Sequence, residues 1–118
     1  MKQPDLFIFA GEASGDLLGA GLLDALHQQS SSFQVCGVGG PKMRSRKFHS
    51  LLAMEEFQVM GFTDVLASIP RLWKHFRFLR DSILKMEPKG VVLIDYPGFT
   101  LRLAKALRKK GYKGQLIH

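Results

Sequence analysis

FAGEASGDLLGAG, residues 9–21, joins the end of an apolar run to the start of a helical pattern. The run Leu6–Ala10 is continuously apolar, which is typical of a strand buried on both faces of a sheet. We expect Ser14 to cap a helix that continues to about Gln29. One face of that helix would carry an apolar stripe made of Leu18, Leu22, Ala25 and Leu26. A buried strand that passes at once into a helix indicates an α/β fold.

The rest of the chain repeats this alternation of strand and helix. Further strands are expected at Phe33–Val38, at Val91–Ile94 and at Gln115–Ile117. Helices are expected from about Ile69 to Met86, with Pro70 in the first turn, and from Phe99 to Lys110. Short strands or turns are expected over 42–67. The pattern predicts an α/β, Rossmann-like parallel sheet with helices on both faces. Because the last strand begins only just before His118, we expect the chain to be part of a longer domain.

Composition and charge restrict the possible classes of protein. The 118 residues are 46% hydrophobic, and the single cysteine, Cys36, excludes an internal disulfide. Residues 71–118 carry twelve Lys/Arg and three Asp/Glu, so the excess positive charge lies in this part of the chain. Such a surface fits phosphate groups, membrane headgroups or nucleic acid, or it is simply solvated. The four histidines are scattered along the sequence, and no metal site is expected.

Three segments follow predicted strands and should meet at the carboxyl edge of the sheet, where open α/β sheets bind ligands. These segments are 11–16, 37–41 and 95–100. The first matches neither the Walker A pattern nor the dinucleotide-binding pattern. Its carboxylates, Glu12 and Asp16, would repel phosphate but accept hydrogen bonds from hydroxyl groups. The alternative is structural: Ser14 caps the helix, and Gly15 lets that helix approach the sheet.

Asp95 directly follows the buried strand Val91–Ile94 and should lie at the same edge. A partly desolvated carboxylate in this position can act as a general base. It could equally cap the next helix, and position alone leaves both interpretations open.

Four motifs occur in register across nearly the whole chain. They are Ala10–Asp16, Gly37–Met43, Met54–Glu56 with Val59–Phe62, and Ile94–Phe99. Together they resemble the lipid-A-disaccharide synthase family, inverting glycosyltransferases of the GT-B fold. The chain departs from the family pattern at Thr100, where we expect asparagine.

The resemblance implies transfer of diacylglucosamine from UDP-diacylglucosamine to diacylglucosamine 1-phosphate, giving lipid A disaccharide phosphate and UDP. Asp95 would be the catalytic base and Glu12 the second candidate. Four neighbouring residues would contact the acceptor: Gly11, Ser14, Gly15 and Asp16. Residues 1–118 would be the truncated N-terminal, acceptor-side domain, with the UDP-sugar-binding domain absent and the fragment inactive alone. No cofactor is implied.

The predicted helix from Ile69 carries a second, basic face that would contact an anionic membrane. That face contains Arg71, Lys74, Phe78 and Lys85. The hydrophobic residues Met60, Phe62, Val65 and Leu66 lie in the loop before the helix and, by the resemblance, would add to the membrane contact. The apolar stripe on the same helix (Ile69, Leu72, Trp73, Phe76, Leu79 and Ile83) is expected to pack in the core. We therefore expect a cytoplasmic protein, peripheral on the inner face of the bacterial inner membrane. Two alternatives are a non-catalytic α/β binding module with a basic, membrane-facing helix and, less well supported because no such motif occurs, a nucleic-acid binder.

Overall fold

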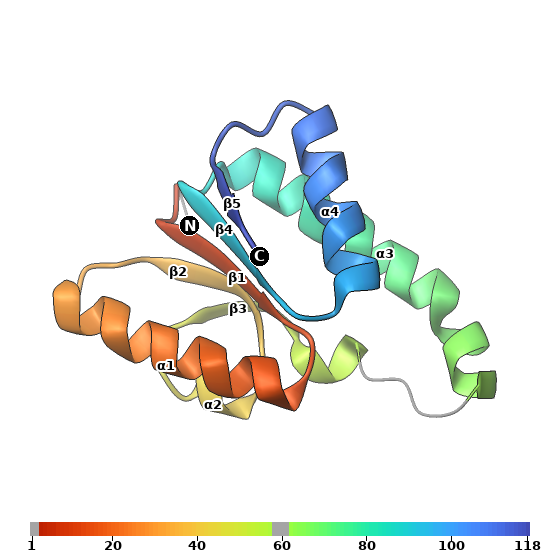
Figure 1. The fold of residues 1–118 in the computed structure, drawn as a ribbon, viewed down its shortest axis with the longest axis horizontal. Helices are drawn as coiled ribbons and strands as arrows, with labels where there is room; N and C mark the ends of the chain where they lie inside the picture. Colours follow the sequence, from red (N-terminus) through yellow and green to blue (C-terminus); the bar gives the residue numbers. More distant parts are fainter. Residues whose placement is uncertain (1–2, 58–61) are drawn as a thin grey trace.

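The protein folds around one sheet of five parallel strands in the order β3-β2-β1-β4-β5 (Figure 1). The computed structural model describes residues 3–57 and 62–118, with the backbone alone at 62–67. The strands are β1 (Leu6–Ala10), β2 (Val35–Gly39), β3 (His49–Ala53), β4 (Gly90–Ile94) and β5 (Gln115–Ile117). The helices are α1 (Ala13–Gln29), α2 (Pro41–Arg44), α3 (Phe62–Met86) and α4 (Pro97–Lys109), with a 3₁₀ turn η1 (Met54–Phe57).

Alternate side chains of the central strand β1 supply two separate hydrophobic cores. Phe7 and Phe9 point to the core that α3 and α4 cover, whereas Ile8 and Ala10 point to the core beneath α1 and α2. All four side chains are fully buried. Figure 1 shows α1 and α2 on one side of the sheet and α3 and α4 on the other. The predicted α/β class, a parallel sheet with helices on both faces, is therefore confirmed.

The strand order reverses direction between β1 and β4, and this position determines where the site lies. The chain leaves β1 through α1 toward β2, but it reaches β4 on the other side of β1 by way of α3. Ala10 pairs with Ile94 in the parallel register, so Gly11 and Asp95 follow directly on neighbouring strands. In open α/β sheets such a reversal opens a crevice at the carboxyl ends of the strands.

The predicted apolar stripe of α1 is confirmed only in part, because Leu22 and Leu26 pack half-buried against the core, whereas Leu18 and Ala25 are exposed. Leu18 is 62% exposed, whereas small residues and Leu23 form the buried face. The small residues are Gly15, Gly19 and Ala20, and they let the helix backbone lie close to the sheet. A periodicity search weighted toward leucine misses a face built from glycine and alanine.

Helix α3 begins at Phe62, not near Ile69, so Pro70 lies inside the helix and not in its first turn. Proline has no N–H, and the carbonyl four residues earlier loses its usual donor, which costs about 3 kcal/mol in a helix interior. Close to Pro70 along the helix, the Arg71 guanidinium donates a hydrogen bond to Ser68 Oγ at 3.3 Å. The unassigned region 42–67 contains α2, β3 and η1 ahead of the helix.

Candidate functional site

The turn between β4 and α4 has an unusual backbone conformation. Asp95 and Tyr96 have φ values of 55° and 60°, both in the left-handed region that non-glycine residues seldom occupy. Three side-chain hydrogen bonds hold the turn. Thr100 Oγ1 donates toward the carbonyls of Asp95 and Tyr96 at 3.2 and 3.1 Å, and the Tyr96 hydroxyl donates to the Phe57 carbonyl at 2.8 Å. Strained backbone that the surroundings hold in place is concentrated at functional sites.

Asp95 presents its carboxylate at the surface of this turn. The side chain is exposed, so the expectation of partial desolvation is wrong for the described residues. The residue lines a hollow of about 350 Å³ together with Leu93, Pro97, Thr100, Leu101 and His118. Asp95 precedes the helix by two residues and Tyr96 occupies the N-cap, with no side-chain capping bond. The alternative that Asp95 merely caps α4 is therefore not supported.

Ser14 lies in the first turn of α1 and faces Asp95. Its hydroxyl oxygen is 3.4 Å from Asp95 Oδ2. The prediction that Ser14 caps α1 is wrong, because the N-cap is Glu12 and no side chain closes that end of the helix. The structure thus brings together two predicted site residues that are 81 positions apart.

Glu12 lies at the same edge, exposed and in extended conformation at the N-terminus of α1. Burial raises the pKa of the Tyr96 phenol, and the negative charge of Glu12 raises that pKa further. The phenol stays protonated and can donate to the Phe57 carbonyl.

Gly11 and Gly15 are buried, and both make room for neighbouring side chains. A β-carbon on Gly11 would lie 3.2 Å from the Tyr96 ring, and one on Gly15 would lie 3.2 Å from Ile94 Cγ2. Such distances are tighter than ordinary van der Waals contact. The structure therefore shows a packing role for both glycines, and contact with an acceptor stays a prediction for them.

Asp16 has a structural role that the sequence interpretation did not anticipate. The residue is 3% exposed, and its carboxylate accepts three backbone N–H groups at 2.9–3.0 Å, from Gly40, Lys42 and Met43. It therefore satisfies the N-terminus of α2 and ties that helix to α1. These bonds show a structural role for Asp16, and its contact with an acceptor stays a prediction.

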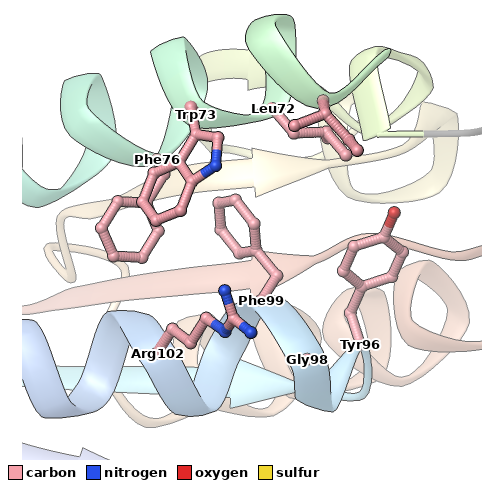
Figure 2. Close-up of a pocket in the computed structure, with 8 residues that line it drawn as sticks. Leu72, Trp73, Phe76, Tyr96, Gly98, Phe99 and Arg102 are labelled. Atoms are coloured by element: carbon pink, nitrogen blue, oxygen red, sulfur yellow. The ribbon is translucent and has the colours of Figure 1, made fainter. Parts of the chain in front are cut away.

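An apolar groove lies next to the strained turn, between α3 and α4, and sequence analysis missed it (Figure 2). Its volume is about 400 Å³, and its lining residues are Ile69, Leu72, Trp73, Phe76, Tyr96, Gly98, Phe99 and Arg102. The expectation that the α3 stripe packs in the core holds only for its second half. Phe76, Leu79 and Ile83 are buried. In the first half only Leu72 packs half-buried against the core, whereas Ile69 and Trp73 are 42% and 44% exposed. The sequence alone does not reveal the groove, because the residues that line it and the residues that pack in the core recur at the same helical spacing.

The predicted basic face of α3 is at the surface, as Arg71, Lys74, Phe78 and Lys85 are all exposed. Arg80 pairs with Asp81 at 2.9 Å. Met60, and the side chains of Phe62, Val65 and Leu66, lie outside the described part of the structure. Within residues 3–57 and 62–118, no helix has the length and apolarity needed to cross a membrane. Across the same residues, no group of three or more His, Cys, Asp or Glu side chains is placed to hold a metal ion.

Comparisons of the sequence with known proteins point to a single protein family. The family model described as "Lipid-A-disaccharide synthetase" matches residues 6–118. A lipid-A-disaccharide synthase of Chlamydia trachomatis serovar D is 49% identical over 95% of the chain, and one of Chlamydia abortus is 50% identical over 98%. One of Chromobacterium violaceum is 45% identical over 86%. The chain spans only 18%, 18% and 26% of the lengths of these three relatives. On this match over nearly its whole length, the chain belongs to the lipid-A-disaccharide synthetase family.

Proposed function

We propose that this chain is the acceptor-side part of a lipid A biosynthetic glycosyltransferase of the GT-B fold. The reaction would transfer diacylglucosamine from UDP-diacylglucosamine to diacylglucosamine 1-phosphate, giving lipid A disaccharide phosphate and UDP. Family membership supports the reaction class, and the relatives' names support the lipid A pathway. The domain that holds the UDP-sugar would belong to the remaining length of such an enzyme. The 118 residues alone should therefore be inactive.

Asp95 would be the general base of this transfer. As the acceptor hydroxyl oxygen bonds to the anomeric carbon, its proton would pass to the Asp95 carboxylate. The bond from that carbon to the UDP oxygen would break with inversion, and UDP would leave with the bonding electrons. A positioned general base contributes about 10²–10⁴-fold to such a rate.

Ser14 and Glu12 would support the base in different ways. The Ser14 hydroxyl approaches Oδ2 of Asp95, which leaves the other carboxylate oxygen for the acceptor proton. Glu12 is exposed at the same edge and could accept a hydrogen bond from another sugar hydroxyl. The observation that carries the proposal is the strained Asp95 turn, which faces Ser14 where the strand order reverses.

A segment exchange tests the reaction directly. The matching segment of the Chlamydia trachomatis relative is replaced by this chain, which is 49% identical to it, to give what we call the exchange enzyme. Transfer is assayed with the UDP-linked and 1-phosphate substrates for the exchange enzyme and for residues 1–118 alone. Activity in the exchange enzyme only is the expected result. No activity in either protein, with both folded, would favour the non-catalytic α/β binding module.

We also propose that the basic face of α3 contacts an anionic membrane surface, on the cytoplasmic side of the inner membrane. The exposed cations Arg71, Lys74 and Lys85, with Phe78 among them, support this contact. Each Lys or Arg near anionic headgroups contributes about 1 kcal/mol. Binding to anionic liposomes should exceed binding to neutral liposomes, and negligible binding to both would contradict the proposal.

A further inference from the structure

The groove between α3 and α4 combines apolar walls with one charged side chain. Aromatic and aliphatic residues from both helices form the walls, and the volume of about 400 Å³ is within the usual range for ligand sites. Ile69 and Trp73, on the α3 wall, remain 42% and 44% exposed. A hollow of this composition favours an occupant that is mostly hydrocarbon.

Arg102 is the charged residue of this lining. Among the side chains that the structure describes, no carboxylate lies within ion-pair distance of Arg102 and no hydrogen bond engages it. By contrast, Arg44 binds Glu55, and Arg108 donates to the Tyr112 carbonyl. Figure 2 shows the Arg102 side chain extending from α4 toward Phe99 and the α3 side of the groove. A guanidinium is always charged, and its planar set of donors matches the oxygens of a phosphate group.

The position of Arg102 relates the groove to the candidate catalytic turn. Tyr96 lines the groove and directly follows Asp95 in that turn. Arg102 lies five residues beyond Pro97 on α4, about 7.5 Å along the helix at a rise of about 1.5 Å per residue. A molecule bound in the groove with its anionic group at Arg102 would therefore lie beside the turn that presents Asp95.

We infer that the groove binds one acyl chain of a phosphorylated lipid, with Arg102 as the counter-ion of its phosphate. The inference rests on the proposed function in one respect, since the acceptor proposed there carries both acyl chains and a phosphate. The apolar walls hold the hydrocarbon, and the guanidinium selects the anionic lipid over a neutral one with the same chain. Arg102 is thus a specificity residue for the acceptor.

Trp73 makes the inference testable on this chain, because it is the sole tryptophan and it lines the groove. Its fluorescence is titrated with monomeric decyl phosphate and with decyl glucoside, which carries the same chain on a neutral head. The expected result is about tenfold tighter binding of decyl phosphate, the value of one charge-assisted hydrogen bond. Arg102→Gln should abolish that preference, whereas Lys105→Gln, which removes the same charge from an exposed site on α4, should retain it.

Two further titrations separate the sources of the phosphate. Inorganic phosphate should leave Trp73 fluorescence unchanged, since it lacks the chain that fills the groove. If the groove takes a single lipid molecule, Arg102 does not contribute to binding of a membrane surface. The wild type and Arg102→Gln should then bind phosphatidylglycerol vesicles equally well. Equal binding of the two decyl compounds, or a preference that survives Arg102→Gln in a folded protein, would overturn the inference. The inference would also be overturned if Arg102→Gln weakened binding to the vesicles but not binding to decyl phosphate. These titrations need no turnover, so an inactive exchange enzyme would refute the proposed reaction without refuting the lipid site.

Discussion

The hydroxyl oxygen of Ser14 lies 3.4 Å from Oδ2 of Asp95, although 81 positions separate the two residues in the chain. The contact exists because β1 and β4 are paired neighbours, so the segments that follow them emerge side by side. At this length the hydrogen bond is weak, and catalytic contacts of this kind often shorten when substrate binds. The pair therefore identifies the place at which the proposed chemistry would occur.

Removing the Ser14 hydroxyl should weaken catalysis without weakening the fold. In the exchange enzyme, Ser14→Ala should lower kcat/KM by about 3- to 10-fold, the value of roughly one net hydrogen bond. The change in free energy of unfolding should stay within about 0.5 kcal/mol, since Ser14 is exposed. Ser31→Ala, at another exposed serine, is the matched control. An unchanged kcat/KM would remove Ser14 from the site.

Substitutions at Asp95 should change the free energy of unfolding according to how well the new residue tolerates the left-handed backbone conformation. Glycine adopts a φ of 55° without steric cost, whereas a β-branched residue does not. In urea unfolding of residues 1–118, Asp95→Gly should match the wild type or exceed it by up to about 1 kcal/mol. Asp95→Val should lower the free energy of unfolding by about 1–2 kcal/mol. Equal midpoints for Gly and Val would contradict the strained geometry.

Asp16 should be a stability residue. Asp16→Ala would leave buried N–H groups at the start of α2 without acceptors and should cost about 2–4 kcal/mol. Asp24→Ala is the matched control on the same helix, since it breaks only the surface pair with Arg46 and should cost less than about 1 kcal/mol. Similar losses for the two variants would contradict the structural role of Asp16.

The Cys36 thiol should be inert in the folded protein. Burial raises its pKa to about 11, so very little thiolate forms near pH 8. Alkylation by iodoacetamide at pH 8 should proceed at the rate of unfolding and accelerate in urea. Because the folded pKa lies above the unfolded value, stability should fall as the pH rises from about 9 through 11. Rapid alkylation without denaturant would show that the thiol is accessible.

Strands β1, β2 and β4 were predictable because burial on both faces leaves apolar runs, whereas β3, which is largely exposed or half-buried, was not assigned from the sequence. Leu6–Ala10 and Gln115–Ile117 match the predicted bounds, and β4 begins one residue before the predicted Val91. Helix faces were harder to predict. The packing of α1 against the sheet depends on Gly15 and Gly19, whose lack of a side chain gives no hydrophobic signal. The start of α3 was missed because Pro70 is far more common in a first turn than inside a helix.

The candidate site was only partly predictable, because its geometry depends on contacts between distant segments. The position of Asp95 at the carboxyl edge was predictable because the residue directly follows a buried strand, but the left-handed turn and the Tyr96 bond to Phe57 were not. The structural role of Asp16 was not predictable either, because its three backbone partners lie 24 or more positions away in the chain. Arg102 gave no signal, since a lone arginine on a basic helix is ordinarily solvated.

Replacing Asp95 by asparagine in the exchange enzyme tests whether Asp95 is the general base of the transfer. Asparagine has the same shape and tolerates the left-handed conformation, but it cannot accept the acceptor's proton at neutral pH. If Asp95 is the base, kcat should fall about 10²–10⁴-fold with stability unchanged, while Asp81→Asn, on the exposed surface of α3, should keep full activity. Transfer within about threefold of the unmodified exchange enzyme would show that Asp95 is not the base.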